Sequence, residues 1–257
     1  MEENEKSNTT CLEEKIAILQ GIIDKSQNIV FFGGAGVSTE SGIPDFRSTD
    51  GLYNQKWKYP PETILSRTFF DENPKEFYRF YREKLIIKGV KPNITHKKLA
   101  MLENRGKLKA IVTQNIDGLH QKAGSKTVYE LHGSTLRNFC MNCKTFYDEN
   151  FILESATDEN SLPICTKCGG LVKPDVVLYE EGLDNQVVEK AIEAIGAADL
   201  LIIGGTSLAV YPAASFINFF RGKNLVIINK TQIPADSHAD LVLHTSLGGV
   251  FEKIKVN

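Results

Sequence analysis

The stretch at residues 28–36, Asn-Ile-Val-Phe-Phe-Gly-Gly-Ala-Gly, decides the fold class. Its first half is a short apolar run that predicts a buried strand, and the glycines form a tight turn directly after it. Residues 38–41, Ser-Thr-Glu-Ser, then predict a helix start. A strand, a glycine-rich turn and a helix in this order begin a nucleotide-binding βα unit. The G-x-G-x-x-G pattern is incomplete, because its third glycine would fall at Thr39, so the turn alone leaves nucleotide binding and a plain strand–helix turn open.

Five further apolar segments continue this pattern along the chain. We expect strands at 107–113, 128–131, 199–203, 224–228 and 240–243, and helices at 12–26, around 74–88, at 185–195 and at 212–220. Short apolar strands that alternate with helices predict a parallel sheet with helices on both faces. The expected fold class is therefore α/β.

Four of the five cysteines form two Cys-x-x-Cys pairs, Cys140 with Cys143 and Cys165 with Cys168. Two such turns can place four thiolates tetrahedrally around one Zn²⁺ ion. Four sulfur ligands leave no open coordination position, so the predicted site is structural rather than catalytic. A redox role is disfavoured because neither pair opens a helix after a strand. The fifth cysteine, Cys11, has no expected role.

Two segments interrupt the sheet pattern. Residues 49–93 are rich in aromatic and charged side chains, and residues 139–170 hold the cysteine module. We interpret both as insertions that join into one small domain, a helical segment plus a zinc module with four cysteine ligands. The expected division is then a sheet domain of residues 11–48, 94–138 and 171–257, the small domain of residues 49–93 and 139–170, and a flexible tail of residues 1–10.

Polar and small side chains gather where the predicted strands end. A second small-residue turn, Gly-Gly-Thr-Ser at 204–207, follows the fourth strand, and Asn229 follows the fifth. Residues 113–117, Thr-Gln-Asn-Ile-Asp, and His132 follow the second and third strands. Ligands bind outside the carboxyl ends of parallel strands, so these residues form the predicted binding site. Two glycine-containing turns suit a dinucleotide, whose phosphates approach backbone N–H groups closely. Taken alone, Asn229 fits a ribose ligand and a surface turn residue equally well.

The bulk composition excludes several functions. The chain has 257 residues, is 42% hydrophobic and 24% charged, and carries a formal net charge of −2. This charge gives no general attraction to DNA or to an anionic membrane. No apolar run approaches the roughly 20 residues of a transmembrane helix, and the polar, acidic N-terminus is not a secretory signal. We expect a cytoplasmic protein without a membrane or direct nucleic-acid partner, and the sequence leaves the oligomeric state open.

Taken together, these motifs resemble those of the sirtuins, the family of NAD-dependent protein deacylases. The resemblance rests on residues 34–47 (Gly-Ala-Gly-Val-Ser-Thr-Glu-Ser-Gly-Ile-Pro-Asp-Phe-Arg), 113–120 (Thr-Gln-Asn-Ile-Asp-Gly-Leu-His), 131–133 (Leu-His-Gly), both cysteine pairs, and 205–214 (Gly-Thr-Ser-Leu-Ala-Val-Tyr-Pro-Ala-Ala). It implies a Rossmann-like parallel sheet domain with a smaller zinc-binding and helical domain inserted. NAD and an acyl-lysine protein or peptide would meet between the two.

The resemblance also implies roles for the matching residues. Asp117 would recognise the nicotinamide carboxamide, and a residue near Leu247 would lie under the adenine. Val177 and Tyr179 would bind the substrate, within a stretch at 176–181 to which an extended substrate would add as a strand. The expected cofactor-binding residues are Gly34, Ala35, Thr39, Phe46, Arg47, Gln114, Asn115, Ile116, Asp117, His132, Gly205, Thr206, Ser207, Asn229 and Leu247.

In this family the acyl-lysine amide oxygen attacks the anomeric carbon of the nicotinamide ribose and expels nicotinamide. A ribose hydroxyl then attacks the imidate that forms. The resemblance makes His132 the general base of this second step and adds Asn115 and Asp117 as catalytic residues. An imidazole with a pKa near 6.5 suits that role at neutral pH. The products would be free lysine, nicotinamide and O-acyl-ADP-ribose, so the expected activity is NAD-dependent protein-lysine deacetylation.

Two departures from the family pattern bear on the substrate. The family commonly has Phe-Gly-Glu where this chain has Tyr-Glu-Glu at 179–181. Sirtuins that prefer succinyl or malonyl groups carry Tyr-x-x-Arg near the acyl pocket, and here Tyr78 is followed by Tyr81 in place of the arginine. Arg82 is one residue further, about 100° around the helix. We therefore predict an acetyl or another neutral acyl group.

Other functions fit parts of the sequence. Mono-ADP-ribosyl transfer would use the same NAD pocket, and a deacylase could prefer a longer neutral acyl group. A non-enzymatic zinc-ribbon adaptor would need a basic, aromatic surface on residues 139–170, which are instead acidic. A plain NAD dehydrogenase would need a proton relay beside a substrate pocket, and no such relay is evident.

Overall fold

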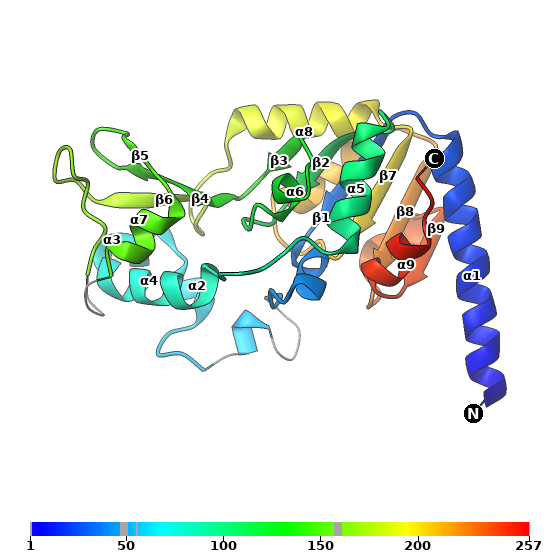
Figure 1. The fold of residues 1–257 in the computed structure, drawn as a ribbon, viewed down its shortest axis with the longest axis horizontal. Coiled ribbons are helices and arrows are strands. Elements are labelled where there is room, and N and C mark those ends of the chain that lie inside the picture. The colour runs from blue at the N-terminus through cyan, green and yellow to red at the C-terminus, as the bar shows by residue number, and fades with distance from the viewer. Residues whose placement is uncertain (1, 47–50, 55, 157–160, 257) are drawn as a thin grey trace.

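The structure is a computed structural model that describes residues 2–46, 51–54, 56–156 and 161–256. Figure 1 shows a large sheet with its helices at one end of the molecule and a smaller lobe at the other. We call the latter the small lobe; it comprises the described residues of 51–86 and 133–178. Within the described ranges, no helix is both long and apolar enough to span a membrane.

The large sheet has six strands in the order β3-β2-β1-β7-β8-β9, and every neighbouring pair is parallel. The strand order therefore reverses between β1 and β7, which is the topological switch point of a Rossmann-like sheet. The predicted α/β class and parallel sheet are confirmed. The strands are β1 (Ile29–Gly33), β2 (Leu108–Thr113), β3 (Val128–Glu130), β7 (Leu200–Gly204), β8 (Asn224–Asn229) and β9 (Leu241–His244).

Helices cover both faces of this sheet, which explains why its central strands, β1 and β7, are apolar and buried along their whole length. Phe31 and Phe32 of β1 point to opposite faces, because side chains alternate along a strand, and both are fully buried. Each such burial stabilises the fold by roughly 2–3 kcal/mol. One face packs against α1 (Glu2–Lys25), α5 (Ile94–Asn104) and α9 (Leu247–Lys253), and the other against α8 (Asn185–Ala197) and the 3-10 helix η5 (Ala213–Phe219).

The small lobe contains an antiparallel sheet and a separate aromatic-rich core. Phe77, Ile152 and Val172 come from different segments of the chain and are fully buried in this core. The two sequence insertions therefore pack as one unit. The sheet of the small lobe has the order β5-β4-β6, with β4 (Gly133–Cys140), β5 (Phe146–Tyr147) and β6 (Val172–Val176). The helices of this lobe are α2 (Pro61–Ile64), α3 (Arg67–Glu72), α4 (Pro74–Phe80), the π-helical turn η4 (Tyr81–Leu85) and α7 (Glu149–Glu154).

Several local elements differ from the expectations. The first helix starts at Glu2, so residues 2–10 are helical where we expected a flexible tail, because extending a helix needs no new nucleus. The antiparallel sheet of the small lobe extends from Gly133 to Val176, beyond the expected boundaries at 139 and 170, because β4 and β6 pair with each other. Two short 3-10 helices, η1 (Ala35–Val37) and η2 (Thr39–Ser41), replace the helix expected after β1.

The turn at Gly42 explains why that helix does not continue. Gly42 has a left-handed φ of 88°, and Pro44 follows two residues later. A left-handed glycine ends a helical segment, and a proline shortly after it prevents its extension. The segment at 212–220 is likewise a 3-10 helix rather than an α-helix. The remaining short elements are η3 (Leu52–Asn54), α6 (Leu119–Lys122) and η6 (Pro234–His238).

Candidate active site

A cleft of about 620 Å³ lies at the carboxyl edge of the large sheet and extends to the small lobe. Of the residues expected in the site, Gly34 lies behind the cleft, packed on the turn after β7, and Arg47 lies outside the described residues. All the others line the cleft: Ala35, Thr39, Phe46, Gln114, Asn115, Ile116, Asp117, His132, Val177, Tyr179, Gly205, Thr206, Ser207, Asn229 and Leu247. The fold thus brings together residues from seven separate parts of the sequence.

The two glycine-containing turns after β1 and β7 touch each other. The N–H of Gly36 donates to the carbonyl oxygen of Gly205 over 2.8 Å. A Cβ atom at Gly36 would lie 2.7 Å from the Cα of Gly205, and a Cβ atom at Gly34 would lie 2.7 Å from the Cβ of Thr206. Both contacts are closer than carbon atoms tolerate, so these positions require glycine for packing. The resulting surface exposes backbone to the cleft, as a bound phosphate group needs.

The turn that follows β2 is held in place by a buried serine. Asp117 accepts a hydrogen bond from the hydroxyl of Ser38 at 2.6 Å and another from the N–H of Leu119 at 2.8 Å. The side-chain amide of Asn115 donates to the same Ser38 hydroxyl at 3.1 Å. The local sequence assigned Ser38 only to a helix start, and no spacing rule could have shown that its hydroxyl, after β1, contacts both Asn115 and Asp117 after β2.

His132 sits between β3 and β4 with one ring nitrogen occupied. Its Nδ1 lies 3.0 Å from the backbone oxygen of Gln114. A carbonyl oxygen only accepts, so Nδ1 carries the proton and Nε2 keeps its lone pair. Burial lowers the pKa of His132 below its usual 6.5, and the hydrogen bond to Gln114 partly opposes this shift. The imidazole is therefore neutral at pH 7 and can accept a proton through Nε2.

Gln114 links the ends of β2 and β7. Its Oε1 accepts a hydrogen bond from the hydroxyl of Thr206 at 3.3 Å. Its Nε2 is buried and has no hydrogen-bond partner among the described residues. A buried donor without a partner is costly, and Gln114 lines the cleft, so a ligand that offers an acceptor at this point would remove that cost.

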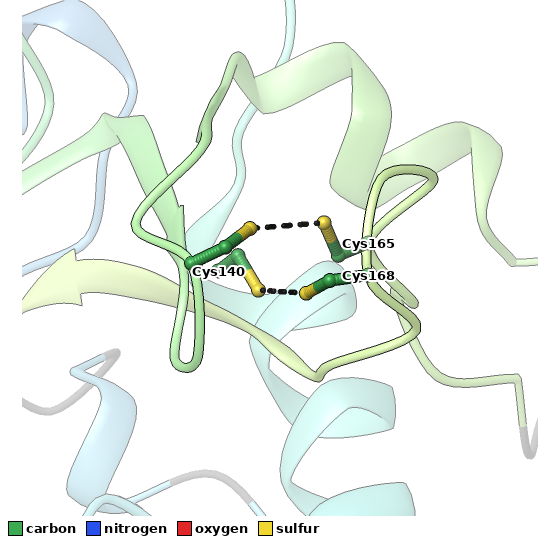
Figure 2. Close-up of side chains that lie close together, drawn as sticks. Cys140, Cys165 and Cys168 are labelled. Atoms are coloured by element: carbon green, nitrogen blue, oxygen red, sulfur yellow. Dashed lines mark hydrogen bonds between the residues drawn. The ribbon is translucent and has the colours of Figure 1, made fainter.

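The four paired cysteines converge in the small lobe (Figure 2). Their sulfur atoms all lie within 4.8 Å of one another, with 3.4 Å between Cys140 and Cys168 and 3.6 Å between Cys143 and Cys165. Tetrahedral Zn²⁺ with Zn–S bonds of about 2.3 Å would place sulfurs about 3.8 Å apart. Hydrogen bonds from Thr145, foremost from its hydroxyl, lower the pKa of Cys143 below its usual value. The four cysteines are positioned to bind one structural zinc ion, as the sequence predicted.

Comparison with known proteins places this combination of sheet, cleft and cysteine cluster in a family. The family model described as "Sir2 family" matches residues 34–212. This chain belongs to the Sir2 family. A protein of Clostridium perfringens (strain 13 / Type A) named NAD-dependent protein deacetylase is 63% identical to it over 246 residues, which cover 95% of this chain and 99% of that relative. A protein of Staphylococcus aureus (strain Mu50 / ATCC 700699) with the same name is 42% identical, over 95% of this chain and 99% of that relative.

Solved structures of Sir2 proteins share the fold over most of the chain. One described as Sir2 bound to acetylated peptide has a TM-score of 0.83 and 34% identity, and the match covers 93% of this chain and 96% of that one. Another, described as Sir2 with a p53 peptide and NAD⁺, has a TM-score of 0.81 and 37% identity over 91% of this chain and 94% of that one. The resemblance inferred from the motifs is thereby confirmed at the level of sequence and fold.

Within this Sir2-family cleft, the side chain of Asn229 is largely engaged by its own fold. Its Oδ1 accepts from the N–H of Thr206 at 3.1 Å, and its Nδ2 donates to the carbonyl oxygen of Thr206 at 2.8 Å. The amide therefore fixes the turn after β7 and retains one N–H for a ligand. Leu247 is buried at the start of α9, where it packs against Gly204 and lines the far end of the cleft.

Residues 176–181, which were expected from the sequence to contact the substrate, continue from the end of β6 in this Sir2-family chain; we call them the substrate stretch. The N–H of Val177 donates to the backbone oxygen of His132 at 3.0 Å. The N–H of Tyr179 donates to the oxygen of Leu65 at 2.9 Å, and its own oxygen accepts from the N–H of Arg67 at 3.0 Å. Residues 65–67 thus already pair with Tyr179, so an added substrate strand would have to use other backbone groups of the stretch.

The substrate stretch also touches the segment that carries Phe46. The hydroxyl groups of Tyr53 and Tyr179 are hydrogen-bonded to each other, and the rings of Phe46 and Tyr53 meet edge to face with centroids 5.6 Å apart. Both Phe46 and Tyr179 line the cleft. The described parts of the two loops expected to hold cofactor and substrate are therefore in contact.

The helix near the expected acyl pocket presents no arginine to the cleft. Tyr81 is fully buried and stacks on Phe77 at a centroid distance of 5.6 Å. Arg82 points into the small lobe, where it donates to the oxygen of Ile152 at 2.9 Å and to the hydroxyl of Ser155 at 3.0 Å. Lys84 does line the cleft, but it forms an ion pair with Glu83 at 2.9 Å. The described lining therefore offers no unpaired arginine for a carboxylate.

Proposed function

We propose that this chain is an NAD-dependent protein-lysine deacetylase that transfers the acyl group to ADP-ribose and releases nicotinamide. The proposal is carried by one observation: a neutral imidazole, His132, lies in a cleft at the switch point of a Rossmann-like sheet, with Nδ1 occupied and Nε2 able to take a proton. Membership of the Sir2 family and the deacetylase names of the relatives support the reaction.

The cleft residues fit NAD in two respects. The touching turns at Gly36 and Gly205 offer backbone that a pyrophosphate can approach, and the buried Nε2 of Gln114 lacks an acceptor. Bound NAD supplies an electrophilic ribose carbon with nicotinamide as the leaving group. We assign the phosphates to the turns around Ala35 and Gly205. The further cofactor contacts of the proposal are Gly34, Thr39, Phe46, Arg47, Gln114, Asn115, Ile116, Asp117, Thr206, Ser207, Asn229 and Leu247.

Three side chains carry the proposed chemistry. His132 accepts a proton from a ribose hydroxyl through Nε2, which makes that hydroxyl a nucleophile. Asp117, fixed by Ser38 and by the N–H of Leu119, orients the nicotinamide carboxamide. Asn115 is tied to the same serine and holds the ribose beside it. All three are immobilised by the fold before any ligand binds, which is what positioning of reactants requires.

The proposed substrate is an acyl-lysine protein or peptide with a neutral acyl group. Val177 and Tyr179 line the cleft, Val177 next to His132, and form the proposed substrate contacts. Tyr81 stands where a carboxylate-binding arginine would be needed, and Arg82 is engaged by Ile152. Acetyl-lysine is therefore preferred over succinyl-lysine in this proposal.

The domain division and location belong to the proposal as well. We divide the chain into a sheet domain that binds NAD and a small lobe that carries zinc, with the cleft between them. The zinc ion is structural, because four cysteines fill a tetrahedral coordination sphere. The enzyme is proposed to work in the cytoplasm.

An acetyl-lysine peptide assay with and without NAD tests the function. We expect deacetylated peptide, nicotinamide and O-acetyl-ADP-ribose in equal amounts by mass spectrometry, only when NAD is present. His132→Ala should lower turnover about 100-fold or more, the usual loss for a general base, while circular dichroism stays native. ADP-ribosylated peptide in place of O-acetyl-ADP-ribose would assign the chain to mono-ADP-ribosyl transfer instead. Turnover without NAD would contradict the proposal.

A further inference from the structure

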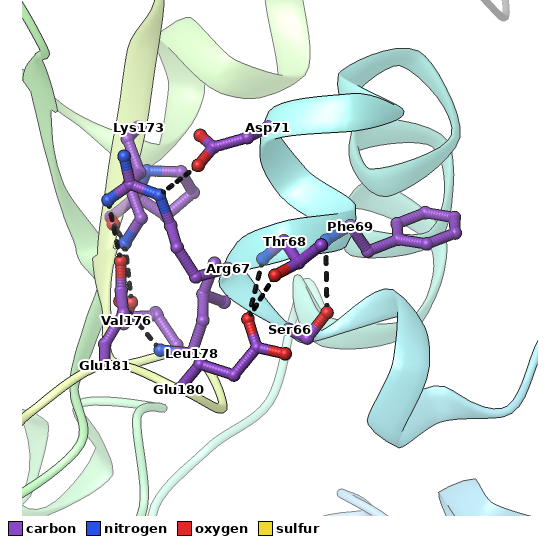
Figure 3. Close-up of polar contacts among 11 residues, drawn as sticks. Ser66, Arg67, Thr68, Phe69, Asp71, Lys173, Val176, Leu178, Glu180 and Glu181 are labelled. Carbon is purple, nitrogen blue, oxygen red and sulfur yellow. Dashed lines mark hydrogen bonds and ion pairs between the residues drawn. The ribbon is translucent and has the colours of Figure 1, made fainter.

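Glu180 departs from the family pattern and makes contacts that a glycine cannot make. Its Oε2 accepts two hydrogen bonds from Thr68, at 2.9 Å from the backbone N–H and at 2.7 Å from the hydroxyl (Figure 3). Thr68 lies at the start of α3, where the first N–H groups have no partner within the helix. The carboxylate therefore joins the substrate stretch to the beginning of a helix in the small lobe.

The backbone of Glu180 indicates that this contact is required for a particular conformation. Glu180 has a left-handed φ of 75°, a region that residues with a Cβ atom rarely adopt and that glycine adopts freely. A non-glycine residue persists there only when its surroundings fix it. The hydrogen bonds to Thr68, which also lower the pKa of the Glu180 carboxyl group, provide that fixation.

The residues on both sides of Glu180 also attach the substrate stretch to the small lobe. The preceding residue, Tyr179, pairs through its backbone with Leu65 and Arg67. The following residue, Glu181, accepts from the N–H of Leu178 at 2.9 Å and forms an ion pair with Lys173 at 3.1 Å. Figure 3 shows the side chains of Glu180 and Glu181 reaching α3 and β6 from one tight turn.

We propose that Glu180 is a positioning residue for acyl-lysine binding, which holds the substrate stretch in its binding conformation through Thr68. This inference rests on the proposed deacetylase function. At the other end of the stretch, the N–H of Val177 donates to the backbone oxygen of His132, so the stretch runs from the Thr68 contact to the residue that carries the proposed catalytic imidazole. Among the described residues, no hydrogen bond joins the stretch directly to the turns that carry Asn115 and Gly205, and it meets Gln114 only through His132.

The place of this anchor, at α3 and away from the turns that carry Asn115 and Gly205, gives the inference a specific signature. Without the Thr68 contact, the substrate stretch can leave its binding conformation. The fraction of the protein that is competent to bind peptide then falls, and the apparent peptide affinity falls in proportion. Peptide affinity should therefore weaken, while NAD affinity and turnover at saturating peptide should not change. If the Glu180 carboxylate had no positioning role, its removal would change neither the affinity for peptide, nor the affinity for NAD, nor the turnover at saturating peptide. General destabilisation of the fold would change all three.

Four variants of the full chain test this. Glu180→Ala removes the carboxylate, Glu180→Gly also relieves the left-handed backbone, Thr68→Val removes only the hydroxyl, and Thr68→Ser keeps it. A fluorescein-labelled acetyl-lysine peptide is titrated by anisotropy, and NAD is titrated by calorimetry. We expect the peptide Kd to rise about fivefold in Glu180→Ala and about threefold in Glu180→Gly and Thr68→Val, with recovery in Thr68→Ser and an unchanged NAD Kd.

Glu189→Ala, an exposed carboxylate on α8, is the matched control and should behave as wild type. If Glu180→Ala fails to fold, Thr68→Val and Thr68→Ser still decide the question. Peptide Kd values within about twofold of wild type in the folded variants, or an equal loss of NAD affinity, would overturn the inference and leave the deacetylase function intact. A wild-type chain that neither binds nor deacetylates the peptide would instead overturn the function itself.

Discussion

The imidazole of His132 donates its Nδ1–H to the backbone oxygen of Gln114 across 3.0 Å. The contact ties the end of β3 to the end of β2, so the orientation of the ring depends on the parallel pairing of these strands. Because a backbone carbonyl cannot change its role, the bond fixes the tautomer as well as the ring orientation. His132 is thereby committed to accept a proton through Nε2.

This geometry predicts where the acid limb of the pH–rate profile falls. Burial lowers the pKa of His132 below 6.5, and the hydrogen bond to Gln114 opposes the shift only in part. The base is active when neutral, so activity should be constant near pH 7 and should fall as the pH drops through a midpoint below 6.5. The measurement is kcat/KM for an acetyl-lysine peptide between pH 5 and 9. A midpoint above 7 would show that His132 is not the titrating base.

The contact between the two glycine-containing turns predicts a selective loss of NAD binding. A methyl group at Gly36 would press on the Cα of Gly205 from 2.7 Å and on its oxygen from 2.9 Å, and backbone atoms cannot move aside as side chains do. Gly36→Ala should therefore separate the turns and weaken NAD binding at least about tenfold by calorimetry. Gly21→Ala is the matched control: nothing lies within 4 Å, and alanine suits the interior of α1. Equal NAD affinity in both folded variants would refute the assignment of the phosphate site.

The sequence was most informative where one kind of interaction decides the structure. The apolar run at 28–32 could only be a strand covered on both faces, and the spacing of Cys140 and Cys143 limits their sulfur atoms to one point. The order of the strands was not readable from these patterns, because it depends on which edges pair after the chain has turned. The motif resemblance implied a Rossmann-like parallel sheet, and the strand order β3-β2-β1-β7-β8-β9 came from the structure.

Sequence patterns could not predict contacts between residues that are distant in the chain. Nothing in the local sequence connects Ser38 to Asp117, or Glu180 to Thr68, since each pair meets only after the sheet and the small lobe have formed. The short 3-10 helices after β1 were missed for a related reason. The helix signal at Ser38 was local, whereas its early end depends on the left-handed turn at Gly42.

Removal of zinc should unfold the small lobe. Cys140 and Cys165 are buried in the hydrophobic core of that lobe, so four unliganded sulfurs within 4.8 Å of one another would weaken the packing around them. Structural zinc sites contribute several kcal/mol to folding. We expect one zinc per chain by mass spectrometry and a melting temperature about 10 °C lower or more after chelation or in Cys165→Ala. Cys11→Ala, outside both pairs, should keep its zinc. A metal-free chain with unchanged melting would show that the cysteines have no structural role.

Two buried histidines should make the fold sensitive to acid. The rings of His96 and His120 lie 4.7 Å apart, and burial lowers the pKa of His96 to about 4 and that of His120 to about 3. Below pH 6.5 the unfolded chain binds protons that the folded chain excludes, so stability falls with decreasing pH, by about 2 kcal/mol for His120 alone at pH 5. His120→Leu should flatten the decline in urea midpoint between pH 7 and 5, and His238→Leu, at an exposed site, should not. If His120→Leu keeps the full wild-type decline, other groups cause the acid sensitivity.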